Sequence, residues 1–212
     1  MPQWNLEDMI QYKDRSVIVL RKPAGLAVQS AKVYESDLES MLKNAFGEVH
    51  IVQRLDRGVE GLLVLAGTKK AAALLTAQLG DGRLKKEYTA KVSGTIPKDA
   101  DTLTDYLVKD ARNNMSRVAA PDEVTRLHAK KAVLDYRRIG ESLLGITLHT
   151  GRHHQIRVQL SHAGMPILGD VKYGGEPWPS LCLCSTGVEF VHPLTGKTLS
   201  FHTEPDSFDI HG

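Results

Sequence analysis

The chain has 212 residues, of which 42% are hydrophobic and 25% charged, and its formal net charge is +2. Such a chain can bury one full core, and no apolar run approaches the ~20 residues of a transmembrane helix. The N-terminus lacks a basic stretch followed by an apolar one, so the sequence predicts no signal peptide. We expect residues 1–212 to form a single cytoplasmic domain without a membrane partner.

The N-terminal part predicts a strand followed by a helix. Residues 16–20 have the apolar composition of a buried strand, and residues 36–46 place their apolar side chains on one helical face. Ser36 and Glu39 have the spacing of a capping box, which predicts the helix start. Gly47 is expected to end this helix.

A second helix and a further strand come next. Thr68 is expected to cap a helix that ends at Gly80 and packs through its leucines. Residues 86–93 alternate in polarity, which predicts a strand with Tyr88 on its apolar side.

The middle of the chain is harder to interpret. Residues 97–127 mix prolines, asparagines and scattered charges, so we expect a loop-rich insertion with a short strand at 103–108. Residues 132–136 and 144–149 predict two more strands. A helix is expected from 153 to 162, because a glycine and a proline follow it.

The C-terminal part predicts strands at 181–185 and 188–191 and a hairpin that ends at Phe201. Strands outnumber helices and mostly follow one another. The expected class is therefore α+β, with a mixed, largely antiparallel sheet flanked by helices.

The two cysteines, Cys182 and Cys184, are separated by one residue in a strand-like run. Such neighbours are poorly placed to bridge each other, and no second pair exists to complete a zinc site. We expect both to be reduced and structural.

An aspartate lies between two arginines in Arg54-Leu55-Asp56-Arg57, after a short apolar run and before a glycine-flanked turn into another. One interpretation is a carboxylate that is held in position for chemistry. The other is a surface loop with an ion pair, because charged clusters between strands are common. This segment alone leaves both open.

Basic residues gather in two stretches although the net charge is small. Residues 83–91 contain four of them beside Glu87, and residues 126–138 contain five beside Asp135. This pattern is typical of a surface that binds phosphates, and equally of a solvated strand face.

Three segments together resemble one enzyme family, the RluA-type RNA pseudouridine synthases. Gln53-Arg54-Leu55-Asp56-Arg57, followed by Gly61-Leu62-Leu63, resembles the catalytic segment of that family. Lys86-Glu87-Tyr88-Thr89-Ala90-Lys91-Val92-Ser93-Gly94 resembles its strand motif, and Thr150-Gly151-Arg152-His153-His154-Gln155-Ile156-Arg157-Val158, continuing to Gly169-Asp170, resembles its third motif. Lys22-Pro23-Ala24-Gly25 and His192-Pro193-Leu194-Thr195-Gly196 add flanking matches in the same order. The resemblance implies the pseudouridine synthase fold, with a catalytic cleft across the sheet and without the N-terminal RNA-binding domain that many members carry.

The sequence departs from the family pattern at a few positions beside these motifs. Gln53 replaces a histidine, Gly58-Val59-Glu60 replaces Asp-Thr-Ser, and His153 replaces a threonine. The changes flank the key residues and remove none of them. They bear on substrate preference more than on chemistry.

The resemblance implies that Asp56 is the catalytic carboxylate, acting as nucleophile or base. Either role requires the ionised form, which a nearby arginine favours, and Arg157 matches the family's arginine for this purpose. Tyr88 matches the aromatic residue that lies against the target base. We therefore expect Arg157 to contact Asp56 in a cleft whose opposite side carries Tyr88.

The resemblance also implies residues that bind the substrate. Arg54 is expected to fill the space of the flipped nucleotide or to hold phosphate, although it can also be a surface partner of Asp56. Leu183 is expected to pack against the base. Arg152, His154 and Gln155 are expected to contact RNA, with His154 alternatively positioning Arg152.

The histidines around Arg152 suggest an alternative, a zinc site built from His149, His153 and His154. Adjacent residues on a helix point about 100° apart, and an acidic ligand is not evident nearby. We therefore predict no metal and no other cofactor.

Two function hypotheses remain. The first is an isomerase that converts uridine to pseudouridine in structured ribosomal or transfer RNA, acting as a monomer. The second is an RNA-binding module or RNA chaperone that keeps the fold without turnover. The joint presence of Asp56, Tyr88 and Arg157 favours the enzyme, since binding alone needs no carboxylate facing a polyanion.

Overall fold

The computed structural model describes residues 4–30, 36–206 and 208. The chain divides into two compact units, one formed by Met1–Lys86 and Cys184–Asp206, the other by Glu87–Leu183 and Ser207–Gly212. We describe each unit by itself, and the expectation of a single domain stays a prediction. Within the described ranges, no helix is long and apolar enough to cross a bilayer.

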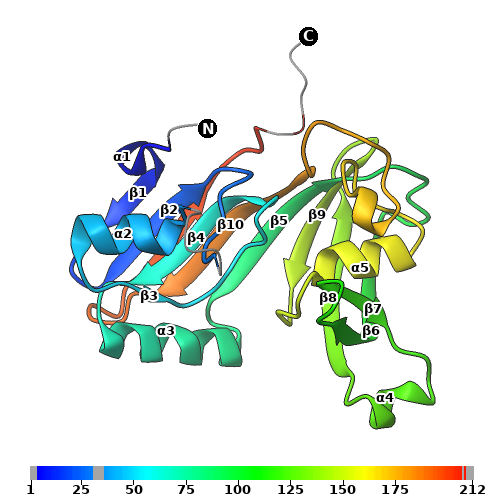
Figure 1. Cartoon of the computed structure of the whole chain (residues 1–212), viewed down its shortest axis with the longest axis horizontal. Helices are drawn as coiled ribbons and strands as arrows, with labels where there is room; N and C mark the ends of the chain where they lie inside the picture. Colours follow the sequence, from blue (N-terminus) through cyan, green and yellow to red (C-terminus); the bar gives the residue numbers. More distant parts are fainter. Residues whose placement is uncertain (1–3, 31–35, 207, 209–212) are drawn as a thin grey trace. The chain divides into compact units, whose positions relative to one another are not determined.

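The first unit is built on a mixed sheet (Figure 1). Its strands are β1 (Ile10–Lys13), β2 (Val17–Lys22), β4 (Glu60–Ala66) and β10 (Leu183–Val191), in this spatial order, with β3 (His50–Ile51) on β4 and β11 (Thr198–His202) on β10. β4 pairs with β10 in parallel, whereas β1, β2, β3 and β11 pair antiparallel with their neighbours. Every residue of β4 is buried, which explains its unbroken apolar sequence.

Three helices accompany this sheet: α1 (Leu6–Met9), α2 (Leu38–Phe46) and α3 (Lys69–Asp81). α3 packs on one face, where Ala71 and Leu75 join a core with Leu62, Val64 and Phe190. α2 buries Leu38 and Leu42 of the predicted apolar stripe completely, whereas Met41 and Phe46 are half-buried and Ala45 is exposed.

The predicted helix ends are partly confirmed. Thr68 caps α3 by accepting a hydrogen bond from Ala71 N, and Gly47 ends α2. The capping box of Ser36 and Glu39 is wrong, because Asp37 is the N-cap and accepts from Ser40 N at 2.8 Å.

Two more details of these helices differ from the prediction. The Asp37 carboxylate also accepts a hydrogen bond from Ser30 N at 2.6 Å. This contact from outside the helix holds Asp37 in place as the N-cap instead of Ser36. α3 continues past Gly80 to Asp81, because the left-handed residue that ends it is Gly82.

The second unit is built on an antiparallel sheet. Its strands are β5 (Lys85–Lys91), β9 (Leu143–Leu148), β8 (Lys130–Arg138), β6 (Ala100–Asp110) and β7 (Met115–Val118), in this spatial order. Its helical elements are α4 (Glu123–Arg126), α5 (Gln155–His162) and the 3₁₀ turn η1 (Val171–Tyr173). α5 covers one face of the sheet through Val158, which packs on Leu107 and Ala132.

The expected loop-rich insertion at 97–127 is wrong. Most of it is a long hairpin of β6 and β7, followed by the short helix α4 (Figure 1). β6 was predicted too short because half of its residues face solvent and are polar, so its apolar alternation is weak. Its pairing with β8, from Ala100 opposite Arg137 to Leu107 opposite Lys130, supplies the order that the local sequence lacks.

The strands expected at 181–185 and 188–191 are one strand, β10, which continues through Thr186 and Gly187 because β11 pairs with it there. The sequence also missed the short elements α1, β1, β3 and η1. Cys182 and Cys184 are buried and are not joined in a disulfide, as predicted, and burial raises the pKa of the Cys184 thiol to about 12. The α+β class with a mixed, largely antiparallel sheet is confirmed.

Candidate active site

Asp56 lies on a tight turn between β3 and β4 in the first unit. Its backbone carbonyl accepts a hydrogen bond from Val59 N at 3.0 Å, which closes the turn. Leu55 and Val59 are buried on either side, whereas Asp56 itself is half-exposed. The turn thus presents a carboxylate between two anchored side chains.

The exit of this turn requires a glycine. Gly61 has φ +111°, and a Cβ there would lie 2.3 Å from the carbonyl oxygen of Ser185 on β10. Only glycine allows the two strands to approach so closely without strain. Gly61 therefore fixes the close approach of the start of β4 to β10.

Lys22 supports the turn from inside the first unit, although the sequence pattern placed it only in a flanking motif. The side chain is fully buried, and Nζ donates to the carbonyl oxygens of Pro23 at 2.9 Å, Leu26 at 2.8 Å and Arg57 at 3.2 Å. Burial lowers the pKa of Lys22 to about 7, although the charges of Asp56 and Glu60 act to raise it.

The segment around Gly25 completes this support. Arg57 Nε donates to Gly25 O at 2.9 Å, and Gly25 N donates to Arg57 O at 2.8 Å. The turn that carries Asp56 is thus bound on one side to the turn that follows β2. For the supporting role of Lys22, the sequence signal was a charged residue at the end of a buried strand.

Glu60, one of the departures from the family pattern, is buried at the start of β4. Its carboxylate accepts from Asp206 N at 2.9 Å, and Arg21 forms an ion pair with Asp206 at 2.8 Å. This departure therefore binds the C-terminal segment of the first unit.

Arg54 is exposed on the segment that leads into the Asp56 turn. Both interpretations of Arg54, as a surface partner of Asp56 and as a contact for the nucleotide or phosphate, stay predictions.

Tyr88 and Leu183 are buried residues of the second unit. Tyr88 lies on β5 opposite Ile146 of β9, on the apolar side of the strand as predicted. Leu183 lies where β10 begins. Burial lowers the pKa of Lys86, which precedes Tyr88 by two residues.

Arg157 projects from α5 and is bound by a carboxylate that the sequence did not single out. Its Nε and Nη2 each donate to Asp170 at 2.7 Å, and both side chains are largely buried. The guanidinium carbon lies 4.9 Å from the centre of the Tyr173 ring.

The predicted site residues thus belong to two units. Asp56 and Arg54 belong to the first, and Tyr88, Arg157 and Leu183 belong to the second. The expected contact between Arg157 and Asp56 stays a prediction.

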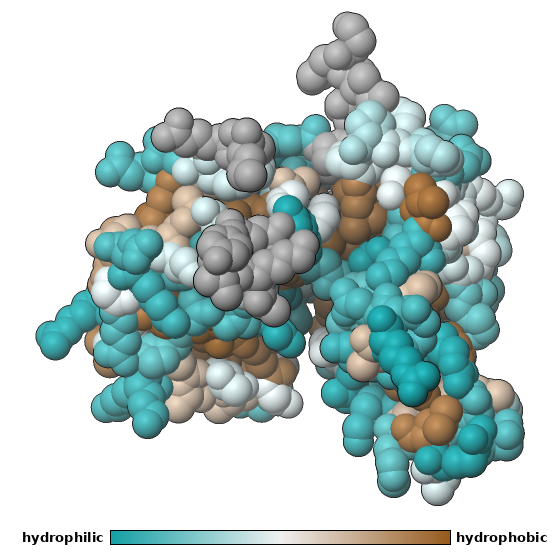
Figure 2. All heavy atoms as spheres, viewed as in Figure 1, coloured by the Kyte–Doolittle hydropathy of each residue, from teal (hydrophilic) through white to brown (hydrophobic). Residues whose placement is uncertain are grey.

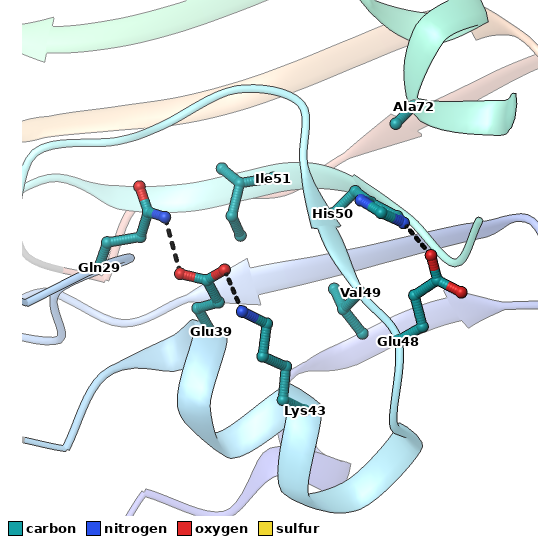
Figure 3. Close-up of a pocket in the computed structure, with 8 residues that line it drawn as sticks. All are labelled: Gln29, Glu39, Lys43, Glu48, Val49, His50, Ile51 and Ala72. Carbon is teal, nitrogen blue, oxygen red and sulfur yellow. Dashed lines mark hydrogen bonds and ion pairs between the residues drawn. The ribbon is translucent and has the colours of Figure 1, made fainter. Parts of the chain in front are cut away.

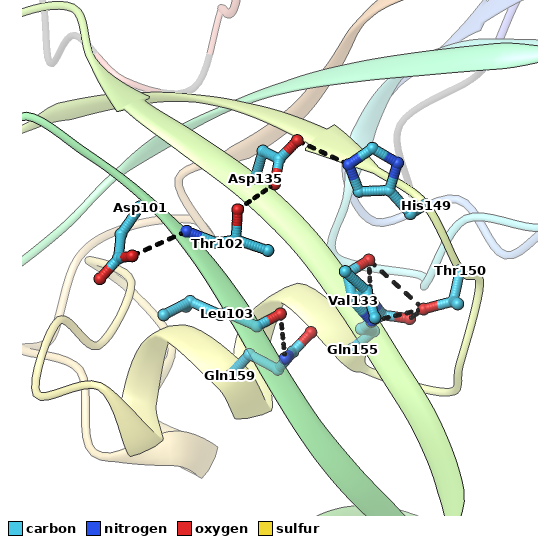
Figure 4. Close-up of polar contacts among 9 residues, drawn as sticks. All are labelled: Asp101, Thr102, Leu103, Val133, Asp135, His149, Thr150, Gln155 and Gln159. Atoms are coloured by element: carbon cyan, nitrogen blue, oxygen red, sulfur yellow. Dashed lines mark hydrogen bonds and ion pairs between the residues drawn. The ribbon is translucent and has the colours of Figure 1, made fainter.

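Gln155 holds the turn before α5 in place (Figure 4). Its Oε1 accepts from Thr150 Oγ1 at 2.8 Å and from Arg152 N at 2.9 Å, and its Nε2 donates to Val133 O at 3.1 Å. The side chain is buried, so these contacts make it a support for the turn. A glutamine after a glycine turn gives little local signal of this role.

Arg152 and His154 point to different partners from that turn. Arg152 is exposed, and its Nε donates to Lys131 O at 2.9 Å. His154 is buried with φ +54°, and its Nδ1 shares a hydrogen bond of 2.8 Å with the Tyr173 hydroxyl.

The histidines that suggested zinc have separate partners. His149 pairs with Asp135 at 2.6 Å (Figure 4), and His153 Nδ1 bonds to Ser116 Oγ at 2.9 Å. No group of three or more potential metal ligands occurs among the residues that the structure describes.

A shallow pocket lies elsewhere in the first unit, beside α2 and β3 (Figure 3). Its polar side chains pair with each other: Glu39 with Lys43 at 2.7 Å, and His50 with Glu48 at 2.6 Å. None of the predicted site residues lines it. It offers no carboxylate aimed at a ligand, so we do not assign the chemistry to it.

Known proteins resemble this chain over most of its length. A family model described as RNA pseudouridylate synthase matches residues 16–162. Two relatives are named ribosomal large subunit pseudouridine synthase C. The protein from Buchnera aphidicola is 31% identical over 210 residues, and that from Haemophilus influenzae is 30% identical over 213 residues.

These two matches cover 92% and 95% of this chain and 66% of each relative, so the chain spans about two thirds of their length. The solved structure of human RNA pseudouridylate synthase domain containing 1 superposes with a TM-score of 0.79, covering 98% of this chain and 87% of that one at 22% identity. This likeness confirms the predicted fold. The chain belongs to the RNA pseudouridylate synthase family.

Proposed function

We propose that this protein converts uridine to pseudouridine in RNA, with the Asp56 carboxylate as nucleophile or base. The observation that carries the proposal is the anchored turn that presents Asp56, inside the segment that matches the family model. A solvated surface loop would not need two buried flanking side chains and a fully buried lysine beneath it.

The reaction breaks the bond from C1′ to N1 of uridine and forms a bond from C1′ to C5. C5 then loses its proton and N1 gains one, so the product is an isomer of the substrate. Atoms and electrons balance without an oxidant or reductant, so the proposal requires no cofactor. An ionised carboxylate can attack the sugar or remove a proton from it. The proposal assigns this role to Asp56 and has Arg157 hold the carboxylate charged and oriented.

The target uracil must leave its stack to reach such a carboxylate, at a cost of a few kcal/mol. An aromatic face returns part of this cost by stacking on the base. We assign this contact to Tyr88, with Leu183 packing against the same base. The Tyr88 phenol also brings a polar group toward C5, where the proton leaves.

An exposed basic surface of the second unit supports RNA as the substrate. It is formed by side chains from the β6–β7 hairpin, β8, the α5 turn and η1: Lys109, Arg112, Lys130, Lys131, Arg152 and Lys172. Figure 2 shows hydrophilic residues over much of the face where β7 and α5 lie. Exposed cations of this kind suit a phosphate backbone.

The relatives named for ribosomal large subunit pseudouridine synthesis support ribosomal RNA as the first substrate to test. We also propose that Arg54 of the first unit and Arg152 of the second contact RNA, with Gln155 supporting the turn that carries Arg152. A contact of the buried His154 with RNA stays a prediction. We propose that the protein acts as a monomer.

Tritium release tests the proposal. Ribosomal RNA containing 5-tritiated uridine should release tritium with the wild-type protein and none with Asp56→Asn, while both bind RNA equally. Asp99→Asn is the matched control, because Asp99 is 91% exposed and should keep full activity. RNA binding without tritium release by the wild-type protein would instead support the RNA-binding module.

A further inference from the structure

The short turn η1 and its N-cap residue, Asp170, contact two other elements of the second unit, α5 and the β6–β7 hairpin. Asp170 binds Arg157 on α5. Lys172 Nζ donates to Asn113 O at 3.0 Å and to Asn114 O at 2.8 Å, at the tip of the β6–β7 hairpin. Tyr173 contacts both sides, so this turn links α5 to the hairpin.

Asp170 and Tyr173 together fix the guanidinium of Arg157 in two directions. Asp170 binds one edge through two parallel hydrogen bonds of 2.7 Å, which sets the plane of the group. The Tyr173 ring covers one face at 4.9 Å, a cation–π contact. A guanidinium fixed at one edge and one face presents its other edge in a defined direction.

The position of the Tyr173 ring depends in turn on its hydroxyl. The hydroxyl oxygen accepts from Ser116 N of β7 at 2.8 Å and shares a hydrogen bond of 2.8 Å with His154 Nδ1. Ser161 Oγ of α5 donates to the Tyr173 carbonyl at 2.7 Å. The ring is therefore held by the hairpin and by α5 at the same time.

A second set of contacts ties the hairpin to the start of α5. His153 bonds to Ser116 Oγ at 2.9 Å and to Asn114 Oδ1 at 3.2 Å, and its ring stacks on His154 at 3.8 Å. A threonine, the usual family residue at His153, has neither the reach nor the ring for these contacts. This chain thus couples its hairpin to α5 through one of its own departures.

We propose that Tyr173 is a positioning residue that couples the β6–β7 hairpin to the orientation of Arg157, with Asp170 and Lys172 completing the connection. This inference rests on the proposed role of Arg157 in pseudouridine formation. The hairpin carries exposed Lys109 and Arg112, which suit RNA phosphates. RNA binding at the hairpin would then help to orient Arg157. Such use of binding energy raises kcat more than it raises RNA affinity.

The experiment compares Tyr173→Phe with wild type under single-turnover and steady-state conditions. The variant keeps the ring over the guanidinium and removes the hydroxyl. We expect kcat to fall about 3- to 10-fold, the factor that one neutral hydrogen bond provides, with KM changed less than about twofold. Val171→Ala, in the same turn and 66% exposed at this position, should match wild type.

A double-mutant cycle separates positioning from general loss of structure. If Tyr173 acts through Arg157, Tyr173→Phe should have little further effect in an Arg157→Lys background. If Arg157→Lys is inactive, the pH–rate profile of Tyr173→Phe is compared with that of the wild type instead. The lower limb of the profile should then lie at higher pH in Tyr173→Phe. Should Tyr173→Phe fail to fold, Ser161→Ala supplies the same comparisons, because it removes the hydrogen bond from Ser161 Oγ to the Tyr173 carbonyl.

Three outcomes would overturn the inference: unchanged kcat in Tyr173→Phe, an equal fold-loss in both backgrounds, or a change confined to KM. Activity of Asp56→Asn or of Arg157→Lys at the wild-type level is a different failure, because it would refute the proposed function itself.

Discussion

Replacing Lys22 by methionine should change how the stability of the protein depends on pH. Methionine keeps the unbranched shape and fills the buried site but carries no charge. It removes the three hydrogen bonds from Nζ to the carbonyls of Pro23, Leu26 and Arg57. It also removes the cost of burying a lysine whose pKa is lowered to about 7.

The direction of the pH effect follows from proton binding. Between pH 7 and 10.5 the unfolded chain keeps the proton on Lys22, whereas the folded protein has lost it. The unfolded state then binds more protons, so the free energy of unfolding rises with pH in this range. With these two pKa values, the wild type gains about 2 kcal/mol between pH 7 and pH 9.

The variant lacks this gain, so its stability deficit relative to wild type should be about 2 kcal/mol larger at pH 9 than at pH 7. Urea unfolding at several pH values in this range measures the difference. The Cys184 thiol, whose pKa is raised to about 12, acts in the opposite direction at high pH, but it does so in both proteins and therefore cancels from the difference.

Lys197→Met is the matched control, because Lys197 is exposed and should show no such dependence. A deficit of Lys22→Met that is constant from pH 7 to pH 9 would refute the reasoning, since it would mean that Lys22 keeps its proton in the folded protein.

Four further outcomes are expected. Arg157→Lys keeps the charge but loses the planar fork that binds Asp170, so kcat should fall at least about 10-fold with RNA affinity kept, and an unchanged kcat would contradict the site. Gly61→Ala should lower the free energy of unfolding by about 3 kcal/mol or more because of the clash with Ser185 O, and thermal unfolding near wild type would contradict the close approach. RNA affinity should fall with salt with a log–log slope steeper than about −3, measured by filter binding, whereas a flat response would exclude the basic surface. Activity should survive EDTA in a buffer that keeps the RNA folded, and a loss that zinc restores would revive a histidine metal site.

Local patterns predicted the parts of this fold whose causes are local. Thr68 and Gly47 sit at helix ends because their own chemistry favours those positions, and Tyr88 follows the alternation of its strand. β6 was mostly missed because its order comes from pairing with β8, which no local pattern of its half-exposed sequence reveals.

The candidate site shows the same division. Family motifs pointed to Asp56 and Arg157 and contained Asp170, but they did not show which side chains contact one another. Asp170 binds Arg157 from 13 residues away, and Tyr173 receives its hydrogen bond from Ser116, 57 residues earlier. Lys22 is buried by segments that close over it from elsewhere in the chain. Such contacts depend on tertiary structure, so spacing alone cannot predict them.

The central claim, that this protein makes pseudouridine with Asp56, is tested most directly by mapping pseudouridine in the total RNA of cells that lack the gene. Cells that regain the wild-type gene should regain pseudouridine at defined uridines, and those that receive Asp56→Asn at equal protein levels should not. Restoration of the same sites by Asp56→Asn, or identical maps with and without the gene, would contradict the account.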